Sequence, residues 1–280
     1  NFHMTTDLNR VPVTFSERLS TLRSSKQSVL CVGLDPDPSR LPSHLLSAHP
    51  LNAAVEFFCR EIVESTSDQA VAFKLNFAFF EALGDSGLQV LRSVLNGIPS
   101  DVLTIADAKR GDIGNSAGFY AHSVFDDLGF DSVTVSPYMG EDSVAPFLTQ
   151  TGTCTFVLAR TSNPGGADFQ LLDVGGEPLY RKVARDAVSW STDTPGTTGL
   201  VVGATDVETM SDLRHMLPET PFLIPGVGSQ GGSAADVMQA SGNGPVLVNS
   251  SRGIIYAGND QDFAKVARNA AIQTRTELGA

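Results

Sequence analysis

Charged residues stand at the ends of short apolar runs in this sequence of 280 residues. The run VLTIAD, which starts at Val102, leads into Asp107, Lys109 and Asp112 in a D-x-K-x-x-D pattern. An ammonium group held among carboxylates can act through its charge and can transfer a proton. The same residues could instead form a structural ion-pair network, which perturbs pKa values without any catalysis. Catalysis and structural support therefore both remain open at this motif.

Side-chain alternation along a strand predicts that several of these charges meet. Asp107 and Lys109 share a face with Leu103 and Ile105 of the same run. The two apolar residues would fill the barrel interior, and the charged pair would lie above them at its end. The same alternation puts Asp35, which follows the run VLCVGL, and Lys74, in the run VAFKLN, on the inward-facing side of their strands. Asp35, Lys74, Asp107 and Lys109 are therefore expected to converge on one mouth.

Two glycine-rich turns are candidates for phosphate binding. PGVGSQGG at 225–232 and SSRG at 250–253 each follow an apolar run. Small residues let backbone N–H groups approach a phosphate, while Arg252 adds a forked cation and Gln230 an amide. Glycines also serve ordinary tight turns, so either turn alone would be weak evidence. Two such turns on neighbouring strands, with an arginine, favour a phosphate site of the kind that (β/α)8 enzymes build there.

Eight short apolar runs rich in β-branched residues recur along the chain, with helical patterns between them. They begin near residues 29, 71, 102, 132, 154, 199, 221 and 245. This order is typical of βαβ units around a parallel sheet, and eight units closing on themselves make a (β/α)8 TIM barrel. A doubly wound open sheet is the alternative. Its usual count is about five or six strands, and its G-x-G-x-x-G turn after the first strand is absent.

The whole chain, 1–280, is predicted to be one barrel domain, because no shift in composition marks a second one. Residues 1–3 precede Met4 and are interpreted as a cloning remnant, and residues 4–28 as an N-terminal extension or helix. Apolar spacing predicts helices over 52–65, 78–95, 115–128, 177–190, 206–216, 233–239 and 260–276. The long loop 160–178, with four glycines and two prolines, predicts a lid or binding loop.

Charge and composition argue against several classes of protein. A net charge of −12 disfavours binding to duplex nucleic acid or anionic membranes. No apolar run reaches the roughly 18 residues that span a bilayer, and no signal-peptide core precedes residue 29. Three cysteines without C-x-x-C spacing indicate neither disulfides nor zinc, which favours the reducing cytoplasm. Five histidines without ligand spacing, and the lack of a G-x-S-x-G turn, predict neither a histidine metal site nor a serine nucleophile.

Six segments resemble, in order, the sequence blocks of the orotidine 5′-monophosphate decarboxylase family. They are FKLNFAFFE at 73–81, IADAKRGDIGNSA at 105–117, SPYMGEDSV at 136–144, RTSNPG at 160–165, PGVGSQGG at 225–232 and NSSRG at 249–253. The similarity covers essentially residues 29–270, and the chain resembles the longer bacterial branch of the family. The resemblance implies the (β/α)8 fold and a decarboxylase.

The resemblance also implies two sets of site residues. The catalytic set is an alternating charge array around the reacting carbon, made of Lys74, Asp107, Lys109 and Asp112. The substrate-binding set is Asp35, Ser116, Ser162, Gln230, Arg252, Pro225, Gly228 and Ser251. Within these sets, Asp35 and Lys74 would hold the ribose hydroxyls, and Ser162 would contact the pyrimidine.

Other implied roles concern the phosphate and a partner subunit. Gln230, Arg252 and nearby backbone amides would hold the phosphate. Ser116 stands where many members of the family carry threonine, and its hydroxyl is expected to contact the ribose. Asp112 would reach into the site of a second copy, which makes the expected active unit a homodimer.

The implied reaction converts orotidine 5′-monophosphate to uridine 5′-monophosphate and CO2 in pyrimidine biosynthesis, with no cofactor and no metal. Loss of CO2 leaves a carbanion at C6 of the ring that no carbonyl or cofactor can delocalise, so its stabilisation must be electrostatic. Lys109 would stabilise this carbanion and deliver its proton to C6. Asp107 would repel the departing carboxylate in the ground state.

Two other functions are compatible with the same residues. A sister barrel, such as a 3-keto-gulonate 6-phosphate decarboxylase, shares the D-x-K-x-x-D strand but uses magnesium and an enediolate. A non-catalytic sensor of phosphorylated ligands could use the same fold. Binding alone does not require carboxylates beside an acidic ligand, so the joint presence of Lys74, Asp107, Lys109 and Asp112 favours catalysis.

Overall fold

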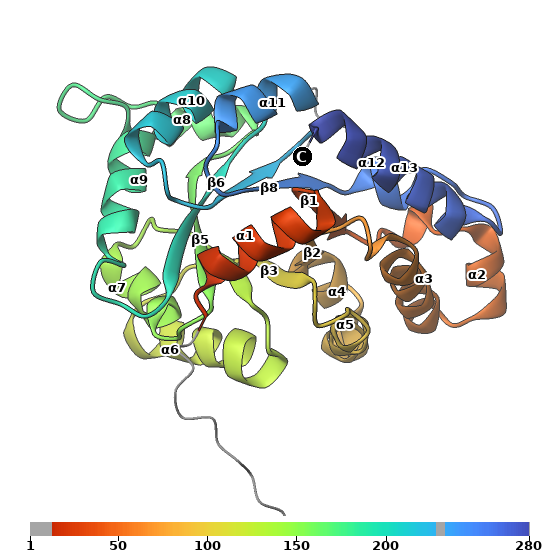
Figure 1. Cartoon of the computed structure of the whole chain (residues 1–280). Helices are drawn as coiled ribbons and strands as arrows, with labels where there is room; N and C mark the ends of the chain where they lie inside the picture. The colour runs from red at the N-terminus through yellow and green to blue at the C-terminus, as the bar shows by residue number, and fades with distance from the viewer. Residues whose placement is uncertain (1–12, 228–232, 280) are drawn as a thin grey trace, which may run out of the picture.

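Eight parallel strands form a closed barrel and follow one another around it in sequence order (Figure 1). The structure, a computed structural model, describes residues 13–227 and 233–279. The strands are β1 (Leu30–Leu34), β2 (Ala72–Asn76), β3 (Leu103–Arg110), β4 (Ser132–Val135), β5 (Cys154–Arg160), β6 (Thr197–Val202), β7 (Phe222–Pro225) and β8 (Val246–Ser250). Because β8 pairs with β1, the predicted (β/α)8 barrel is confirmed and the open sheet is excluded.

Helices surround the barrel on its outside (Figure 1). The α-helices are α1 (Phe15–Lys26), α2 (Ser43–Ala48), α3 (Leu51–Thr66), α4 (Phe77–Glu81), α5 (Gly87–Asn96), α6 (Gly114–His122), α7 (Glu141–Val144), α8 (Ala167–Gln170), α9 (Leu179–Ser189), α10 (Val207–Met216), α11 (Ala234–Ser241), α12 (Arg252–Ile255) and α13 (Phe263–Leu278). Short turns are η1 (Pro38–Arg40), η2 (Gly84–Ser86), the π-helical η3 (Ser123–Leu128), η4 (Ala145–Leu148) and η5 (Pro164–Gly166). Among the described residues, no helix is both long and apolar enough to cross a bilayer.

The α1 helix closes the N-terminal end of the barrel, where Figure 1 shows it lying across the strands. A capping box between Thr14 and Glu17 begins the helix. Phe15 and Leu19 are fully buried in the apolar cluster that fills the barrel, and the Phe15 ring meets that of Phe156 edge to face. An ion pair of 2.5 Å between Arg18 and Asp131 ties the helix to the chain before β4. The predicted extension therefore contains a helix that seals the barrel floor.

Apolar side chains fill the lower layers of the barrel interior. Residues of this interior cluster come from most of the strands and include Cys31, Ala72, Leu103, Ile105, Cys154, Phe156, Val201, Leu223 and Leu247. A larger cluster lies between the strands and the helices, where α3 contributes Val55, Phe58 and Ile62 at the expected three- and four-residue spacing. Within the barrel interior, the charged side chains of the predicted site therefore lie above these apolar layers, at the C-terminal ends of the strands.

The helix predicted over 78–95 is interrupted in the structure. It consists of α4, the turn η2 and α5, and Gly84 has a φ of 75°, a conformation that favours glycine. A Cβ on Gly87 would come within 1.9 Å of the Phe80 carbonyl oxygen, so the chain turns closely there. Apolar spacing continues across this break, which is why the sequence pattern alone suggested a single helix.

Arg214 forms a buried clamp at the N-terminal side of β7 and β8. Its guanidinium lies 3.7 Å from the centre of the Phe222 ring, and its side chain is buried. The guanidinium donates to backbone carbonyl oxygens of Leu217, Pro218, Thr220, Ser241 and Pro245. Burial lowers its pKa to about 10, so it stays charged at neutral pH.

We expect Arg214→Met to lower the free energy of unfolding by roughly 3 kcal/mol or more, because several buried carbonyls lose their donors. Urea unfolding should show a lower midpoint with an unchanged slope. Arg92→Met is the matched control, since Arg92 makes an exposed ion pair with Asp127 and should cost less than about 1 kcal/mol. Equal effects of the two substitutions would contradict the clamp.

Candidate active site

Lys74 and Asp107 form a buried ion pair at the upper end of the barrel. Register places Asn76 of β2 opposite Asp107 of β3, one layer above the apolar interior. Lys74 Nζ lies 2.6 Å from Asp107 Oδ2, and the two residues are only 4% and 8% exposed. Asp35 Oδ1 lies 3.9 Å from the same ammonium group. The predicted convergence of charges from β1, β2 and β3 is present in the structure.

Opposite charges keep both members of this pair ionised. Burial alone would lower the pKa of Lys74, but the charges of Asp107 and Asp35 and the hydrogen bond to Asp107 raise it above its ordinary value. Burial alone would raise the pKa of Asp107, but the charges of Lys74 and Lys109 hold it well below its usual range. The site therefore contains a stable carboxylate between cations at neutral pH.

Lys109 adopts an unusual backbone conformation near the end of β3. Its φ is 45°, in the left-handed region that residues with a Cβ rarely occupy. The pairing of β3 with β4 shifts register between Ala106 and Arg110. Lys109 Nζ nevertheless lies 2.5 Å from Asp107 Oδ1. Asp107 and Lys109 meet, in agreement with the predicted convergence, although the strand between them departs from the regular alternation on which that prediction was based.

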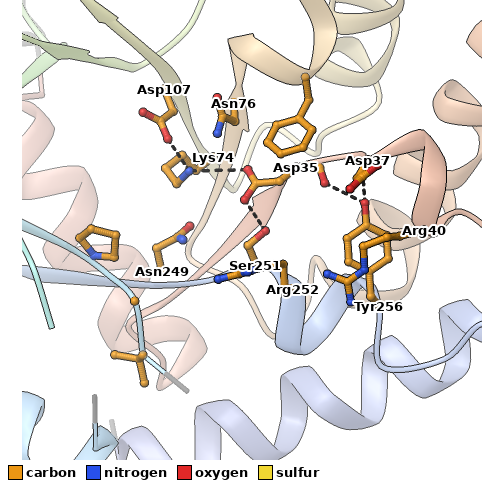
Figure 2. A pocket seen from close by; sticks show the side chains of 14 residues that line it. Asp35, Asp37, Arg40, Lys74, Asn76, Asp107, Asn249, Ser251, Arg252 and Tyr256 are labelled. Atoms are coloured by element: carbon orange, nitrogen blue, oxygen red, sulfur yellow. Dashed lines mark hydrogen bonds and ion pairs between the residues drawn. The ribbon is translucent and has the colours of Figure 1, made fainter. Parts of the chain in front are cut away.

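Two adjoining cavities open at this charge cluster, and both are walled by Lys74, Asp107 and Pro225. The first, about 420 Å³, extends past Asp35 toward Ser251, Arg252 and Tyr256, and Figure 2 shows this side. The second, about 440 Å³, extends toward Lys109 and Ser162. Both volumes suit small-molecule ligands.

The first cavity combines predicted phosphate-binding residues with Asp35. The Ser251 hydroxyl donates to Asp35 Oδ2 at 2.6 Å (Figure 2). It also lies 3.1 Å from the Gly33 carbonyl oxygen. A Cβ on Gly33 would come within 2.8 Å of Ser251 Cβ, so a glycine allows β1 and the end of β8 to approach. Asp35 Oδ1 is buried and accepts no hydrogen bond from the described residues. It is an acceptor that a ligand hydroxyl could satisfy.

The second cavity is more apolar. Leu158, Val201 and Leu223 line it together with Ser162, which follows β5. A Cβ on Gly203 would come within 2.9 Å of the Ser162 backbone nitrogen, so the small residue at the end of β6 lets this turn pack closely. A flat ring with one or two polar edges would match such a surface.

The other predicted site residues fall into two groups. Gly228 and Gln230 fall outside the described residues. Asp112 and Ser116 line neither cavity of their own chain: Asp112 is half-buried and accepts a hydrogen bond of 2.8 Å from the Ile113 N–H, whereas Ser116 is exposed. Near them in the sequence, the residues Ile113 and Phe119 are 56% and 68% exposed.

Sequence reasoning missed several residues that line the cavities, among them Thr134, Asn249 and Tyr256. Thr134 of β4 is buried beside Asp107 and Lys109, and Asn249 of β8 is a buried residue that lines the first cavity. Polar residues inside otherwise apolar strands were the available signal for both. Tyr256 of the segment after α12 accepts a hydrogen bond from the Asp37 N–H and donates to the Asp35 carbonyl oxygen (Figure 2). No local pattern marked this tyrosine.

Among the described residues, no group of three or more histidine, cysteine, aspartate or glutamate side chains is arranged to hold a metal ion. The cations beside Asp107 are instead the ammonium groups of Lys74 and Lys109. The arrangement can therefore place fixed positive and negative charges beside a ligand and can offer a proton from an ammonium group.

Comparison with known proteins gives a consistent picture. The chain matches the orotidine 5′-phosphate decarboxylase / HUMPS family over residues 28–267. It is 46% identical to an orotidine 5′-phosphate decarboxylase of Herpetosiphon aurantiacus, over 92% of this chain and 95% of the relative. A relative of the same name from Cupriavidus metallidurans is also 46% identical, over 95% of this chain and 98% of the relative.

A solved structure supports the same assignment. The OMP decarboxylase of Leishmania donovani is 36% identical and superposes with a TM-score of 0.79, covering 94% of this chain and 100% of the other. The segment that matches the family contains all the strands from β1 to β8 and both cavities. The chain is therefore an enzyme of the orotidine 5′-phosphate decarboxylase / HUMPS family.

Proposed function

We propose that this protein converts orotidine 5′-monophosphate to uridine 5′-monophosphate and CO2, as a cofactor-free carboxy-lyase of pyrimidine biosynthesis. One observation carries the proposal: the Asp107 carboxylate is held between the ammonium groups of Lys74 and Lys109, at 2.6 and 2.5 Å, where two ligand-sized cavities meet. Fixed charges of alternating sign suit a reaction in which charge leaves one atom and develops on its neighbour.

In the proposed reaction, the bond between C6 and the carboxylate carbon breaks, and its electron pair stays on C6. CO2 leaves, and a proton moves from Lys109 Nζ to C6. Two unit charges about 4 Å apart interact by roughly 4 kcal/mol at an effective dielectric near 20, which corresponds to about three powers of ten in rate. This gain applies only if the interaction is stronger in the transition state than in the ground state.

Asp107 and Lys74 have supporting parts in the proposal. Asp107 would stand beside the carboxylate of the substrate and repel it in the ground state, an effect that disappears once CO2 has formed. Lys74, buried between Asp107 and Asp35, keeps the Asp107 carboxylate ionised and offers a hydrogen-bond donor to the ribose. The unsatisfied Asp35 Oδ1 supports a ribose hydroxyl as its missing partner.

The two cavities suit the two ends of the substrate. Arg252 and Ser251 support phosphate binding in the first cavity, with Gln230 and the backbone of 225–232 as further proposed contacts. Ser162 and the apolar wall of the second cavity support binding of the pyrimidine. Binding energy at the phosphate, far from C6, can then be used to orient the ring against Lys109.

The active unit is proposed to be a homodimer that shares its sites. Asp112 and Ser116 line neither cavity of their own chain, and the exposed apolar residues Ile113 and Phe119 lie near them in the sequence. In the dimer, Asp112 of the partner subunit would complete the charge array, and Ser116 would contact the ribose.

The three cysteines are free and buried, which supports the proposed location in the reducing cytoplasm.

The proposed activity predicts that purified protein consumes orotidine 5′-monophosphate without any added cofactor. Ultraviolet absorbance should follow the loss of the substrate, and the product should be uridine 5′-monophosphate. Activity should be unchanged in EDTA, because the positive charges at the reacting carbon are ammonium groups. Loss of activity in EDTA that magnesium restores would instead favour the metal-dependent sister decarboxylase.

Different roles for two cations predict different kinetic effects. Lys109→Ala should lower kcat by about three powers of ten or more while leaving the affinity for uridine 5′-monophosphate nearly unchanged. Arg252→Ala should mainly raise KM, by roughly tenfold to a hundredfold, as expected for a charged hydrogen bond to phosphate. Lys182→Ala is the matched control, because Lys182 makes an exposed ion pair with Asp186 and should change neither constant. The reverse pattern in kinetics and calorimetry would refute these roles.

A shared site predicts complementation between two inactive variants. Lys109→Ala and Asp112→Asn homodimers should each be nearly inactive. After free subunit exchange, about half of the dimers are mixed, and one site in each mixed dimer combines an intact Lys109 with an intact Asp112 of the partner subunit. Mixing should restore roughly a quarter of wild-type activity per subunit. If activity stays flat after verified exchange, each site lies within one chain.

A further inference from the structure

One threonine lies opposite the irregular end of β3. Register pairs Ala106 with Val133 and Arg110 with Val135, so the three residues 107–109 face Thr134 alone. Such a bulge leaves backbone groups of the longer strand without a partner in the ladder. The bulge contains both Asp107 and Lys109, so whatever pairs these orphaned groups also fixes the charge cluster.

The Thr134 hydroxyl accepts a hydrogen bond from one of these unpaired backbone groups, the N–H of Lys109. Thr134 Oγ1 accepts a hydrogen bond of 2.9 Å from the Lys109 backbone N–H. Lys109 has its φ of 45° at this position, which is unfavourable for a residue with a Cβ and persists only where the surroundings enforce it. Thr134 is 2% exposed, so water cannot easily replace its hydroxyl as the acceptor.

The same hydroxyl also fixes the carboxylate. Thr134 Oγ1 donates to Asp107 Oδ1 at 3.1 Å, and Asp107 Oδ1 is the oxygen that Lys109 Nζ contacts at 2.5 Å. A hydroxyl has only one proton, so accepting from the Lys109 N–H leaves that proton for Asp107. The three residues thus form a closed ring of hydrogen bonds from the Lys109 backbone to its own ammonium group.

We propose that Thr134 is a positioning residue that sets the distance and direction of the Lys109 ammonium group relative to the reacting carbon. This inference rests on the proposed decarboxylase function. It assigns the role to the hydroxyl and not to the bulk of the side chain, because both hydrogen bonds use Oγ1. Thr134 lines the second cavity together with Asp107 and Lys109. A shift of these two charged side chains would therefore change the cavity in which the pyrimidine is proposed to bind.

Thr134→Val keeps the shape of the side chain and removes the hydroxyl, whereas Thr134→Ser keeps the hydroxyl. We expect Thr134→Val to lower kcat by about tenfold to a hundredfold, since small displacements of a reacting group cost this much. KM and the affinity for uridine 5′-monophosphate should change less than about threefold, and Thr134→Ser should recover most of kcat. Amide hydrogen exchange at Lys109 should be faster in Thr134→Val and normal in Thr134→Ser.

Thr155→Val is the matched control. Thr155 is equally buried on the neighbouring strand β5, and its hydroxyl donates to the Phe147 carbonyl oxygen at 2.9 Å, away from the charge cluster. It should match wild type in kcat, so a loss caused merely by removing a buried hydroxyl would appear in both variants. Unchanged kcat and unchanged Lys109 exchange in Thr134→Val would overturn the inference. An inactive wild type would overturn the proposed function instead, and the exchange data would then decide the role of Thr134.

Discussion

A nearly buried carboxylate between two ammonium groups is the constraint on which the rest of the site depends. Removing a charge from water costs several kcal/mol, so Asp107 can be buried only if its partners are close and well directed. Lys74 satisfies one oxygen, and Lys109 and the Thr134 hydroxyl satisfy the other. These partners come from three adjacent strands, so the register of β2, β3 and β4 decides whether the carboxylate can exist there at all.

The apolar barrel below the site makes these charges effective. Its interior is filled with side chains such as Leu103, Ile105 and Phe156, and α1 closes its floor with Phe15 and Leu19. These apolar side chains therefore separate the charges from water at the barrel floor. Electrostatic interactions strengthen as solvent is excluded, so the sealed floor raises the influence of each fixed charge on a ligand bound above it.

The sequence predicted the barrel and most of the charge cluster, because both depend on short-range patterns. Eight apolar runs predicted the strands, and the alternation of side chains along them placed Asp35, Lys74 and Asp107 at the same end of the barrel. It did not predict the left-handed Lys109, since neither glycine nor asparagine marks the bulge, nor the part of Thr134, which depends on a register shift between two strands. Only the family resemblance placed Asp112 outside the site of its own chain, because the proposed shared site would depend on how two copies meet.

The structure also gives a physical reason to assign the proposed proton transfer to Lys109 and not to Lys74. The side chain of Lys74 is 6% exposed and is held by two carboxylates, so giving up its proton would leave the buried Asp107 and the half-buried Asp35 without their common partner. The side chain of Lys109 is 52% exposed, and among the described residues its ammonium group forms an ion pair only with Asp107. After Lys109 has delivered its proton, the ammonium group of Lys74 would still neutralise the Asp107 carboxylate. Lys109 could then recover a proton from water at the open end of the barrel. The buried lysine therefore maintains the charge of the site, while the accessible one is free to complete a catalytic cycle.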